Sequence, residues 1–308
     1  MKLVYARLLK ATALALVGLA AEAESSRADL VLGTAVNYGV LTGPSIGNFQ
    51  LSSDTHITGN IGVGSSDGTT TGTNNNIKFA NANVVGNLSL GGTNTNGIGG
   101  TVTGTVSTQV ADVATAYNTI STLSTNLALE TGTALDSGGN FTGTTINASD
   151  GKLDASGNEV FSSDVSKFKP SGALTINGTA DQYVVINLTG NSNFSFTQPI
   201  TLTGGITEDH VLYNITGVGK NLQIAGNAHG GTIQGIIVAL NDKISLDNVL
   251  VNGRVFGGEA GQDFQLVSNF SLVQPATVPE PASLVMMGLG GGMAFVVFRR
   301  KRPAFRSR

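Results

Sequence analysis

Between residues 29 and 273 the chain repeats a short pattern in which apolar and polar positions alternate and then stop at a glycine. The segments ITGNIGVG (57–64) and VVGNLSLG (84–91) show it most fully. Alternation is typical of a strand with one buried face, and glycine permits the positive φ that a tight corner needs. A shorter apolar-x-Gly unit starts at Leu41, Val102, Phe141, Ile176, Leu188, Leu202, Ile215, Ile224, Ile233 and Val251.

Many short strands joined by glycine corners are typical of a solenoid or a sandwich. The units recur at unequal intervals, so no strict tandem repeat is present. We therefore expect an all-β body over 29–273, built as an irregular right-handed β-helix. The segment 138–172 is richer in polar residues, which predicts loops and short edge strands there.

One segment departs from the alternating pattern and has helical periodicity. Its apolar residues follow one another at intervals of three or four, with a polar face between them. This spacing predicts one long α-helix, at about 106–129, packed alongside the β-helix. A helix that binds a partner is the alternative interpretation. The apolar residues are Val106, Val110, Val113, Tyr117, Ile120, Leu123 and Leu127.

Composition agrees with a folded β protein and excludes several classes of function. The chain has 42 glycines, 12% charged residues and no cysteine. The absence of cysteine excludes a disulfide scaffold and a thiolate metal site. The predicted body carries seven basic and seventeen acidic residues, a net charge near −10. Nucleic acid is therefore not an expected partner.

The first 28 residues have the features of a secretory signal. Lys2, Arg7 and Lys10 precede the apolar stretch 11–21, which is too short to cross a bilayer comfortably. Two small-x-small sites end at Ala23 and at Ala28, and the sequence does not choose between them. We expect an exported protein.

The other end of the chain combines a proline-rich linker, an apolar segment and a basic end. A linker at 274–281 precedes a predicted transmembrane helix, which starts the tail 282–308. The basic residues Arg299, Arg300, Lys301 and Arg302 would hold the C-terminus in the cytoplasm. Prolines at 279 and 281 keep the chain extended, a form suited to a protease at the membrane surface. We expect a temporary inner-membrane tether that is cleaved near Pro281.

Candidate catalytic and metal-binding residues are few. His56, His210 and His229 show no metal-ligand spacing. Asp242, Asp247, Glu259 and Asp263 surround Arg254 in the sequence, the residue types that a polysaccharide lyase uses. No fixed spacing ties these residues together, so we interpret them as charges of solvated loops rather than as a lyase site. Asp154, Ser156 and Asn158 begin like a calcium loop, but Glu159 replaces the glycine that such a loop requires. We expect no metal, no cofactor and no catalytic residue.

Threonines provide the candidate contact surface. Residues 69–71 with Thr73, and the run Thr101, Thr103 and Thr105, would place hydroxyl and methyl groups on one face of a strand. Ordinary β-propensity explains threonine in strands as well. The functional interpretation is a flat array that faces ice or a glycan, with Thr101, Thr103 and Thr105 as its candidates.

The tail resembles a PEP-CTERM sorting signal, through Val278, Pro279, Glu280 and Pro281, the apolar segment and the basic end. The resemblance implies a Gram-negative bacterium that makes exopolysaccharide, and an exosortase-type membrane protease as partner. Such tails are also known as ice-binding protein C-terminal domains.

The body resembles choice-of-anchor A and ice-binding-like β-helix domains. The stretches LGTAVNYGVLTG (32–43), VADVATAYN (110–118) and 210–258 carry the likeness. It implies a non-enzymatic structural or adhesion protein of the cell surface or extracellular matrix, with exopolysaccharide as a possible ligand. Ice binding is the alternative function, and a polysaccharide-degrading enzyme is the third.

Overall fold

The computed structural model describes residues 30–276, except 53, 74–75, 94, 227–230 and 260. The described residues up to Pro275 belong to one compact unit, which is described by itself. Within the described part of the chain, no helix has both the length and the apolar character needed to cross a membrane. The predicted signal (1–28) and the predicted transmembrane helix and basic tail (282–308) lie outside the described residues.

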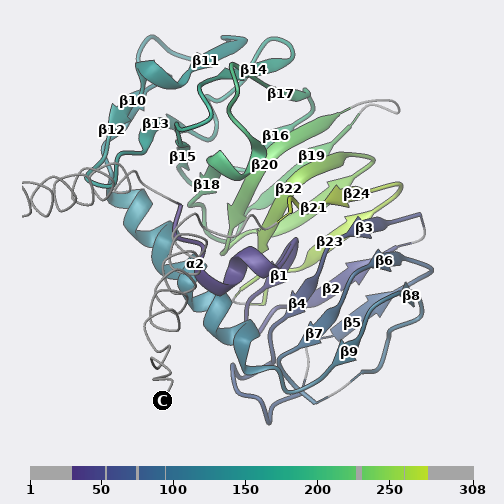
Figure 1. Ribbon diagram of the computed structural model, residues 1–308. Helices are drawn as coiled ribbons and strands as arrows, with labels where there is room; N and C mark the ends of the chain where they lie inside the picture. Colours follow the sequence, from purple (N-terminus) through teal and green to yellow (C-terminus); the bar gives the residue numbers. More distant parts are fainter. Residues whose placement is uncertain are drawn as a thin grey trace, which may run out of the picture. The chain divides into compact units, whose positions relative to one another are not determined.

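The body consists mainly of short strands that pair in parallel and form three long rows (Figure 1). In spatial order the first row contains β10 (Thr133–Ala134), β13 (Glu159–Asp164), β15 (Val184–Thr189), β18 (Val211–Ile215), β20 (Thr232–Ala239), β22 (Leu250–Gly257), β1 (Val40–Thr42), β4 (Ile61–Val63), β7 (Leu88–Leu90) and β9 (Val106–Ser107). A hairpin strand, β12 (Lys152–Leu153), pairs antiparallel to β13.

The second row has two parts. One is a sheet of β11 (Thr145–Asn147), β14 (Leu174–Asn177) and β17 (Ile200–Thr203). The other uses the first halves of β20 and β22, followed by β24 (Ser271–Val273), β3 (His56–Thr58), β6 (Asn83–Val85) and β8 (Thr101–Val102). β17 lies next to β20, which brings the two parts together.

The third row is a six-stranded parallel sheet. Its members are β16 (Phe194–Phe196), β19 (Asn221–Ala225), β21 (Lys243–Asp247), β23 (Phe264–Val267), β2 (Asn48–Leu51) and β5 (Asn76–Phe79). The described part of the chain also has three short 3-10 helices: η1 (Gly33–Asn37) precedes β1, and η2 (Ala148–Asp150) and η3 (Glu208–His210) lie between strands.

The order of the coils differs from the order of the sequence. The chain starts in the middle of the stack and winds outward from β1 to β9. The helix α2 (Ala111–Leu129) then leads to β10, at the other end of the first row. From there the coils return to the middle, where β22 pairs with β1 through Val255 and Val40. Figure 1 shows this seam as purple β1 near yellow-green β22. The body is therefore closed by contacts between its first and last coils.

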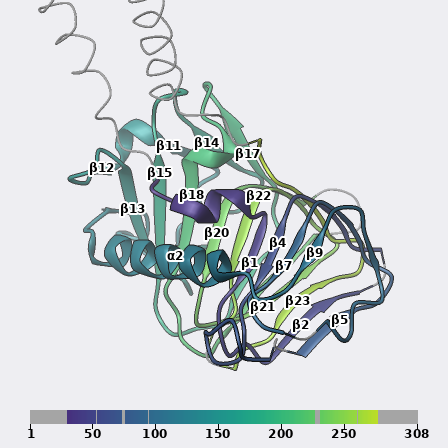
Figure 2. The ribbon, with the colours of Figure 1, turned by 60° about the horizontal axis from the view of Figure 1, so that its bottom comes forward.

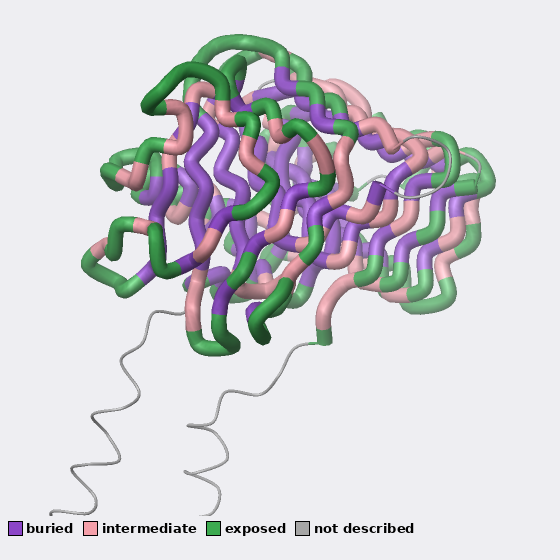
Figure 3. The backbone as a smooth tube through the Cα atoms, turned by 90° about the horizontal axis from the view of Figure 1, so that it is seen from above, coloured by how far each residue is buried: buried purple, intermediate pink, exposed green. Residues whose placement is uncertain are grey.

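The space inside the coils is filled by aliphatic and phenylalanine side chains from all three rows. Figure 3 shows buried segments repeated from coil to coil, with exposed residues concentrated at the turns. Glycines mark corners, as the apolar-x-Gly pattern predicts: Gly59 and Gly253 have φ of 149° and 147°. A Cβ on Gly253 would collide with the carbonyl oxygen of Gly235 in the next coil. The corner thus requires glycine for both conformation and space.

At two glycine corners, Gly59 and Gly86, the next residue is an asparagine, and its role differs from that of the glycine. The side-chain oxygen of Asn60 accepts the N–H of Asn87 at 2.9 Å, and that of Asn87 accepts the N–H of Thr105 at 2.8 Å. Each amide therefore satisfies a backbone donor in the neighbouring coil, where the bend leaves no strand partner. The Gly-Asn dipeptide in the sequence pattern is explained by this ladder.

A second core lies between the outer side of the first row and α2, which runs along it (Figure 2). Val113, Tyr117, Ile120 and Leu127 are buried there, as the helical periodicity predicts. Near the C-terminal end of the helix, Asn187 donates to the Leu127 carbonyl at 2.6 Å. The docked position of the helix is confirmed.

Two segments differ from the prediction. The helix begins at Ala111, because Val106 belongs to β9 and pairs with Leu88 before the chain turns. The segment 138–172 contains more than loops and edge strands, since β13 is a largely buried strand with partners on both sides. The polar residues of 138–172 lie in the turns around β13, and they make the strand difficult to recognise in the sequence.

Candidate ligand-facing surface

The outward side chains of the second row form one long, mostly polar surface, which we call the threonine face. Alternate residues of each strand point outward, while Ile146, Ile176 and Ile233 between them are buried. The threonine face consists of Thr145, Asn147, Thr175, Asn177, Thr201, Thr203, Thr232, Gln234, Leu250, Asn252, Ser271, Val273, His56, Thr58, Asn83, Val85, Thr101 and Thr103.

The register between neighbouring strands spaces the side chains of part of this face regularly. Thr145, Thr175 and Thr201 are direct neighbours across β11, β14 and β17. The hydroxyls of Thr175 and Thr201 lie 3.3 Å apart. In the parallel column, Asn177 donates to Asn147 at 3.2 Å and accepts from Thr203 at 3.2 Å. Hydroxyl, amide and methyl groups are thus held at the spacing of the strands.

These three threonines are not among the residues predicted from the sequence, because that prediction was of an array along one strand. The array instead runs across coils, at right angles to the chain. A signal was present: threonine precedes the apolar-x-Gly unit at Thr101, Thr175, Thr201 and Thr232. The same position recurs once per coil, so stacking the coils aligns it.

The predicted candidates lie at the opposite end of the second row and do not form one straight line. Thr101 is on β8, and Thr103 continues its pairing by donating its N–H to the Val84 carbonyl at 2.9 Å. Gly104 then turns the chain, and Thr105 lies beyond this corner. The predicted single strand face is therefore wrong for Thr105. The ligand-binding role of all three residues stays a prediction.

The threonines at 69–73 are not on a strand face either. They belong to the turn between β4 and β5. The carboxylate of Asp67 accepts the N–H of Thr69 at 2.9 Å and its hydroxyl at 3.0 Å. These hydrogen bonds lower the pKa of Asp67 and keep the hydroxyl of Thr69 within the turn.

The threonine face differs from the other two rows in charge. Its outward residues include no lysine, arginine, aspartate or glutamate. The third row presents Lys78, Lys243 and Asp247, and Lys243 pairs with Asp263 at 3.7 Å. The first row is covered by α2 along part of its length. The threonine face is therefore an extended uncharged surface that runs along the second row.

The acidic cluster predicted around Arg254 does not converge. Arg254 is fully buried and pairs with Asp209 of η3, a residue that the sequence did not single out. Glu259 accepts from the hydroxyl of Tyr117 at 3.3 Å, and burial raises the pKa of that tyrosine. Asp242 accepts the N–H of Lys220, and Asp247 lies on β21. The side chains contact different elements, so the geometry gives no support for a lyase.

Arg254 instead holds the seam of the coil stack. Its Nη2 donates to the carbonyl of Val36 at 3.2 Å, and Gln274 donates to the same oxygen at 3.1 Å. Burial raises the pKa of Asp209, and the neighbouring guanidinium opposes that shift. The start of the body is thereby linked to β22 and to the residue after β24.

The other residues that were considered as metal ligands or catalytic groups make only local contacts. Asp154 accepts the N–H groups of Ser156 and Asn158 at 2.8 Å each, so it closes its own turn. In the described ranges no three histidine, aspartate or glutamate side chains are placed to hold a metal ion. His56 is exposed on β3, the ring of His210 lies 4.0 Å from that of Tyr183, and His229 lies outside the described residues.

Comparison with known families agrees with this architecture. The family model of the ice-binding-like adhesive domain matches residues 22–266, which is most of the chain. The chain belongs to this family. No curated protein sequence matches it.

Two solved structures have the same fold. The ice-binding protein of the Antarctic ascomycete Antarctomyces psychrotrophicus superposes with a TM-score of 0.51 and 19% identity, over 80% of this chain and 98% of that one. An ice-binding protein with antifreeze activity from an Arctic yeast gives a TM-score of 0.51 and 16% identity, over 84% and 98%. At these identities the likeness concerns the fold alone.

The C-terminal sequence matches the PEP-CTERM protein-sorting motif over residues 277–302. This confirms the resemblance of Val278, Pro279, Glu280 and Pro281 to the motif. It indicates a secreted protein that is membrane-anchored during sorting and processed by an exosortase, a membrane protease.

Proposed function

We propose that this chain is an exported, non-enzymatic adhesion protein of the cell surface or extracellular matrix. Its threonine face would bind the exopolysaccharide of the producing cell. The observation that carries the proposal is the uncharged outer surface of the second row, with Thr145, Thr175 and Thr201 in register. The family and the sorting motif support an adhesive role outside the cell.

The chemistry of the face suits an extended, hydrated ligand. Hydroxyls both donate and accept hydrogen bonds, and amides such as that of Asn177 offer both functions side by side. Threonine methyl groups between them remove apolar area from water on contact. A polymer of hydroxyl groups therefore finds complementary partners along many coils without needing a deep pocket.

Ice is the second candidate ligand, favoured by a specific observation. The threonines of β11, β14 and β17 repeat at the spacing of the strands, about 4.8 Å, as a lattice-matching surface requires. The fold is shared with ice-binding proteins. A polysaccharide-degrading activity, the third hypothesis, gains no support from the dispersed carboxylates.

The decisive experiment places a charge in the middle of the threonine face. Thr175→Lys should weaken adsorption to the purified exopolysaccharide about tenfold. The ammonium group must either lose its hydration when the ligand binds or hold the ligand away from the surface. Gln223→Lys, outward on β19 of the third row, is the matched control and should bind as the unmodified protein does. Thr103→Lys tests the far end of the same face.

The same variants separate the two ligands when ice growth is measured in parallel. Adsorption to polysaccharide that survives Thr175→Lys would refute the assignment to this face. Shaping of ice crystals that Thr175→Lys removes, without polysaccharide binding, would establish the second candidate instead. Ice crystals left unshaped at high protein concentration would exclude ice.

The hand of the coils belongs to the same proposal. Parallel strands joined by a crossover wind right-handedly in nearly all known cases. We propose a right-handed β-helix for 29–273, which is supported by the parallel pairing in all three rows.

A further inference from the structure

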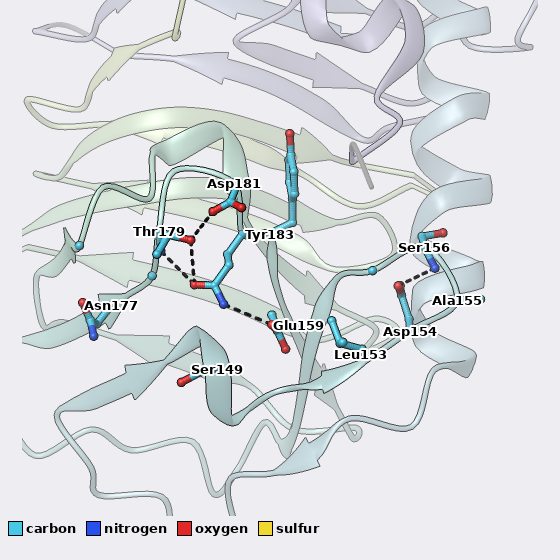
Figure 4. Close-up of a pocket in the computed structure, with 14 residues that line it drawn as sticks. Ser149, Leu153, Asp154, Ala155, Ser156, Glu159, Asn177, Thr179, Asp181 and Tyr183 are labelled. Carbon is cyan, nitrogen blue, oxygen red and sulfur yellow. Dashed lines mark hydrogen bonds between the residues drawn. The ribbon is translucent and has the colours of Figure 1, made fainter. Parts of the chain in front are cut away.

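A polar cleft adjoins the threonine face where the coils resume after α2 (Figure 4). One wall is the β12–β13 turn, and the other is the loop that follows β14. Its volume is about 700 Å³, within the range typical of small-molecule sites. Neither the family match nor the sorting motif assigns a role to it.

Both walls are held by their own hydrogen bonds. The N–H of Thr179 donates to the side-chain oxygen of Gln182 at 2.9 Å, and the hydroxyl of Thr179 donates to Asp181. In the opposite wall, Asp154 accepts two backbone N–H groups of its turn. The cleft is therefore shaped before a ligand arrives, which lowers the entropy cost of binding.

Glu159 lies between the two walls, and Figure 4 shows it at the centre of the lining residues. The residue is 9% exposed. One carboxylate oxygen accepts from Gln182 at 3.3 Å, which connects the base of the cleft to the second wall. A carboxylate has about four acceptor sites, so one hydrogen bond leaves capacity for ligand hydroxyls.

The charge of the lining selects the ligand class. Asp154, Glu159 and Asp181 line the cleft together with neutral polar groups, and no lysine, arginine or histidine is among the lining residues. Acidic ligands are therefore repelled. Paired hydroxyls of a sugar ring suit acceptors of this kind, because each hydroxyl can donate to a carboxylate oxygen.

The position of Asn177 connects the cleft to the threonine face. Asn177 ends β14, is part of the asparagine column of that face, and also lines the cleft. Gly178 and Gly204, at the corners after β14 and β17, continue the lining. A chain that lies along β11, β14 and β17 would reach the cleft at this corner.

We propose that the cleft binds a segment of a glycan chain that carries no acidic groups. This rests on the proposed function, because it names the class of polysaccharide that the threonine face would bind. Glu159 and Asp181 accept hydrogen bonds from the sugar hydroxyls, and Asn177 contacts the part of the chain that continues onto the face.

Titration calorimetry on the exported protein tests the proposal with cellotetraose, chitotetraose and an oligogalacturonate of equal length. The first two should bind and the acidic one should not. Glu159→Gln should weaken binding about tenfold or more, since a neutral amide is a weaker acceptor. It preserves shape and still offers an oxygen to Gln182. Asp54→Asn, an equal charge change in an exposed turn outside the cleft lining, should bind as the unmodified protein does.

Equal binding by Glu159→Gln and the unmodified protein would overturn the proposal, as would binding of the oligogalacturonate alone. Failure of both neutral oligosaccharides to bind at millimolar concentration would also overturn it, as would Ca²⁺ binding in their place. The threonine face is judged separately through Thr175→Lys, which should lower adsorption of the polymer and leave tetrasaccharide binding in place.

Discussion

At the scale of single residues, the fold depends on a few polar side chains in buried positions. Arg254 is the only arginine of the body and is fully buried. It connects η3, through Asp209, with the carbonyl of Val36 near the start of the body. A buried charge needs a partner, and removing one side of such a pair destabilises the fold far more than the pair stabilises it.

The two sides of this pair should respond unequally to mutation. Asp209→Asn leaves a fully buried guanidinium without its carboxylate, and we expect a loss of about 3 kcal/mol in the free energy of unfolding. Arg254→Met should cost less, because the side chain of Asp209 is 33% exposed and can regain water. Urea unfolding of both variants and of the double variant measures this. An equal or reversed order would contradict the assigned burial.

At the scale of elements, α2 is an integral part of the body. It covers apolar side chains on the outer side of the first row, among them Val185 and Leu212. Its last turn is fixed through Asn187, and Asn214 donates to the carbonyl of Ser124 at 3.0 Å. It also connects β9 to β10, which lie at opposite ends of the first row.

Introducing a charge on the buried side of the helix tests this. Val113 has no exposed surface, so Val113→Asp should lower stability by several kcal/mol and reduce the melting temperature strongly. The matched variant Asn118→Asp adds the same charge on the exposed side of the helix and should change stability by less than about 0.5 kcal/mol. An unchanged melting temperature for Val113→Asp would contradict the burial of this side of the helix in the second core.

At the scale of the whole molecule, the body and the tail have different roles. The body carries a net charge near −10 and the surface that we propose binds ligand, whereas the tail carries the sorting motif. The apolar stretch 282–298 has seventeen residues, at the lower limit for a bilayer core of about 30 Å. Such a segment suits a transient tether.

Mass spectrometry of the mature protein tests the fate of the tail. We expect cleavage near Pro281 and no peptide beyond about residue 283, because the prolines present an extended chain to the exosortase. An intact RRKRPAFRSR end recovered from cell-surface material would show a permanent anchor. Replacing Pro279 and Pro281 by alanine should retain the protein in the inner membrane.

The sequence by itself determined the local features of this protein. Alternation predicted short strands, glycine marked the corners, and the three- and four-residue spacing of Val113, Tyr117 and Ile120 predicted a docked helix. These features depend on neighbours within a few residues, so a single sequence contains them. The sorting motif was equally readable, since its parts occur in order within one short segment.

Tertiary structure alone decided the order of the coils and the composition of the candidate surface. Nothing local predicts that β22 pairs with β1, since those strands are far apart in the chain and meet only after α2 returns it to the other end of the stack. Likewise Thr145, Thr175 and Thr201 become neighbours through register between coils. Strand pairing fixes such register by burying the apolar positions between them, and that burial exists only in the assembled stack.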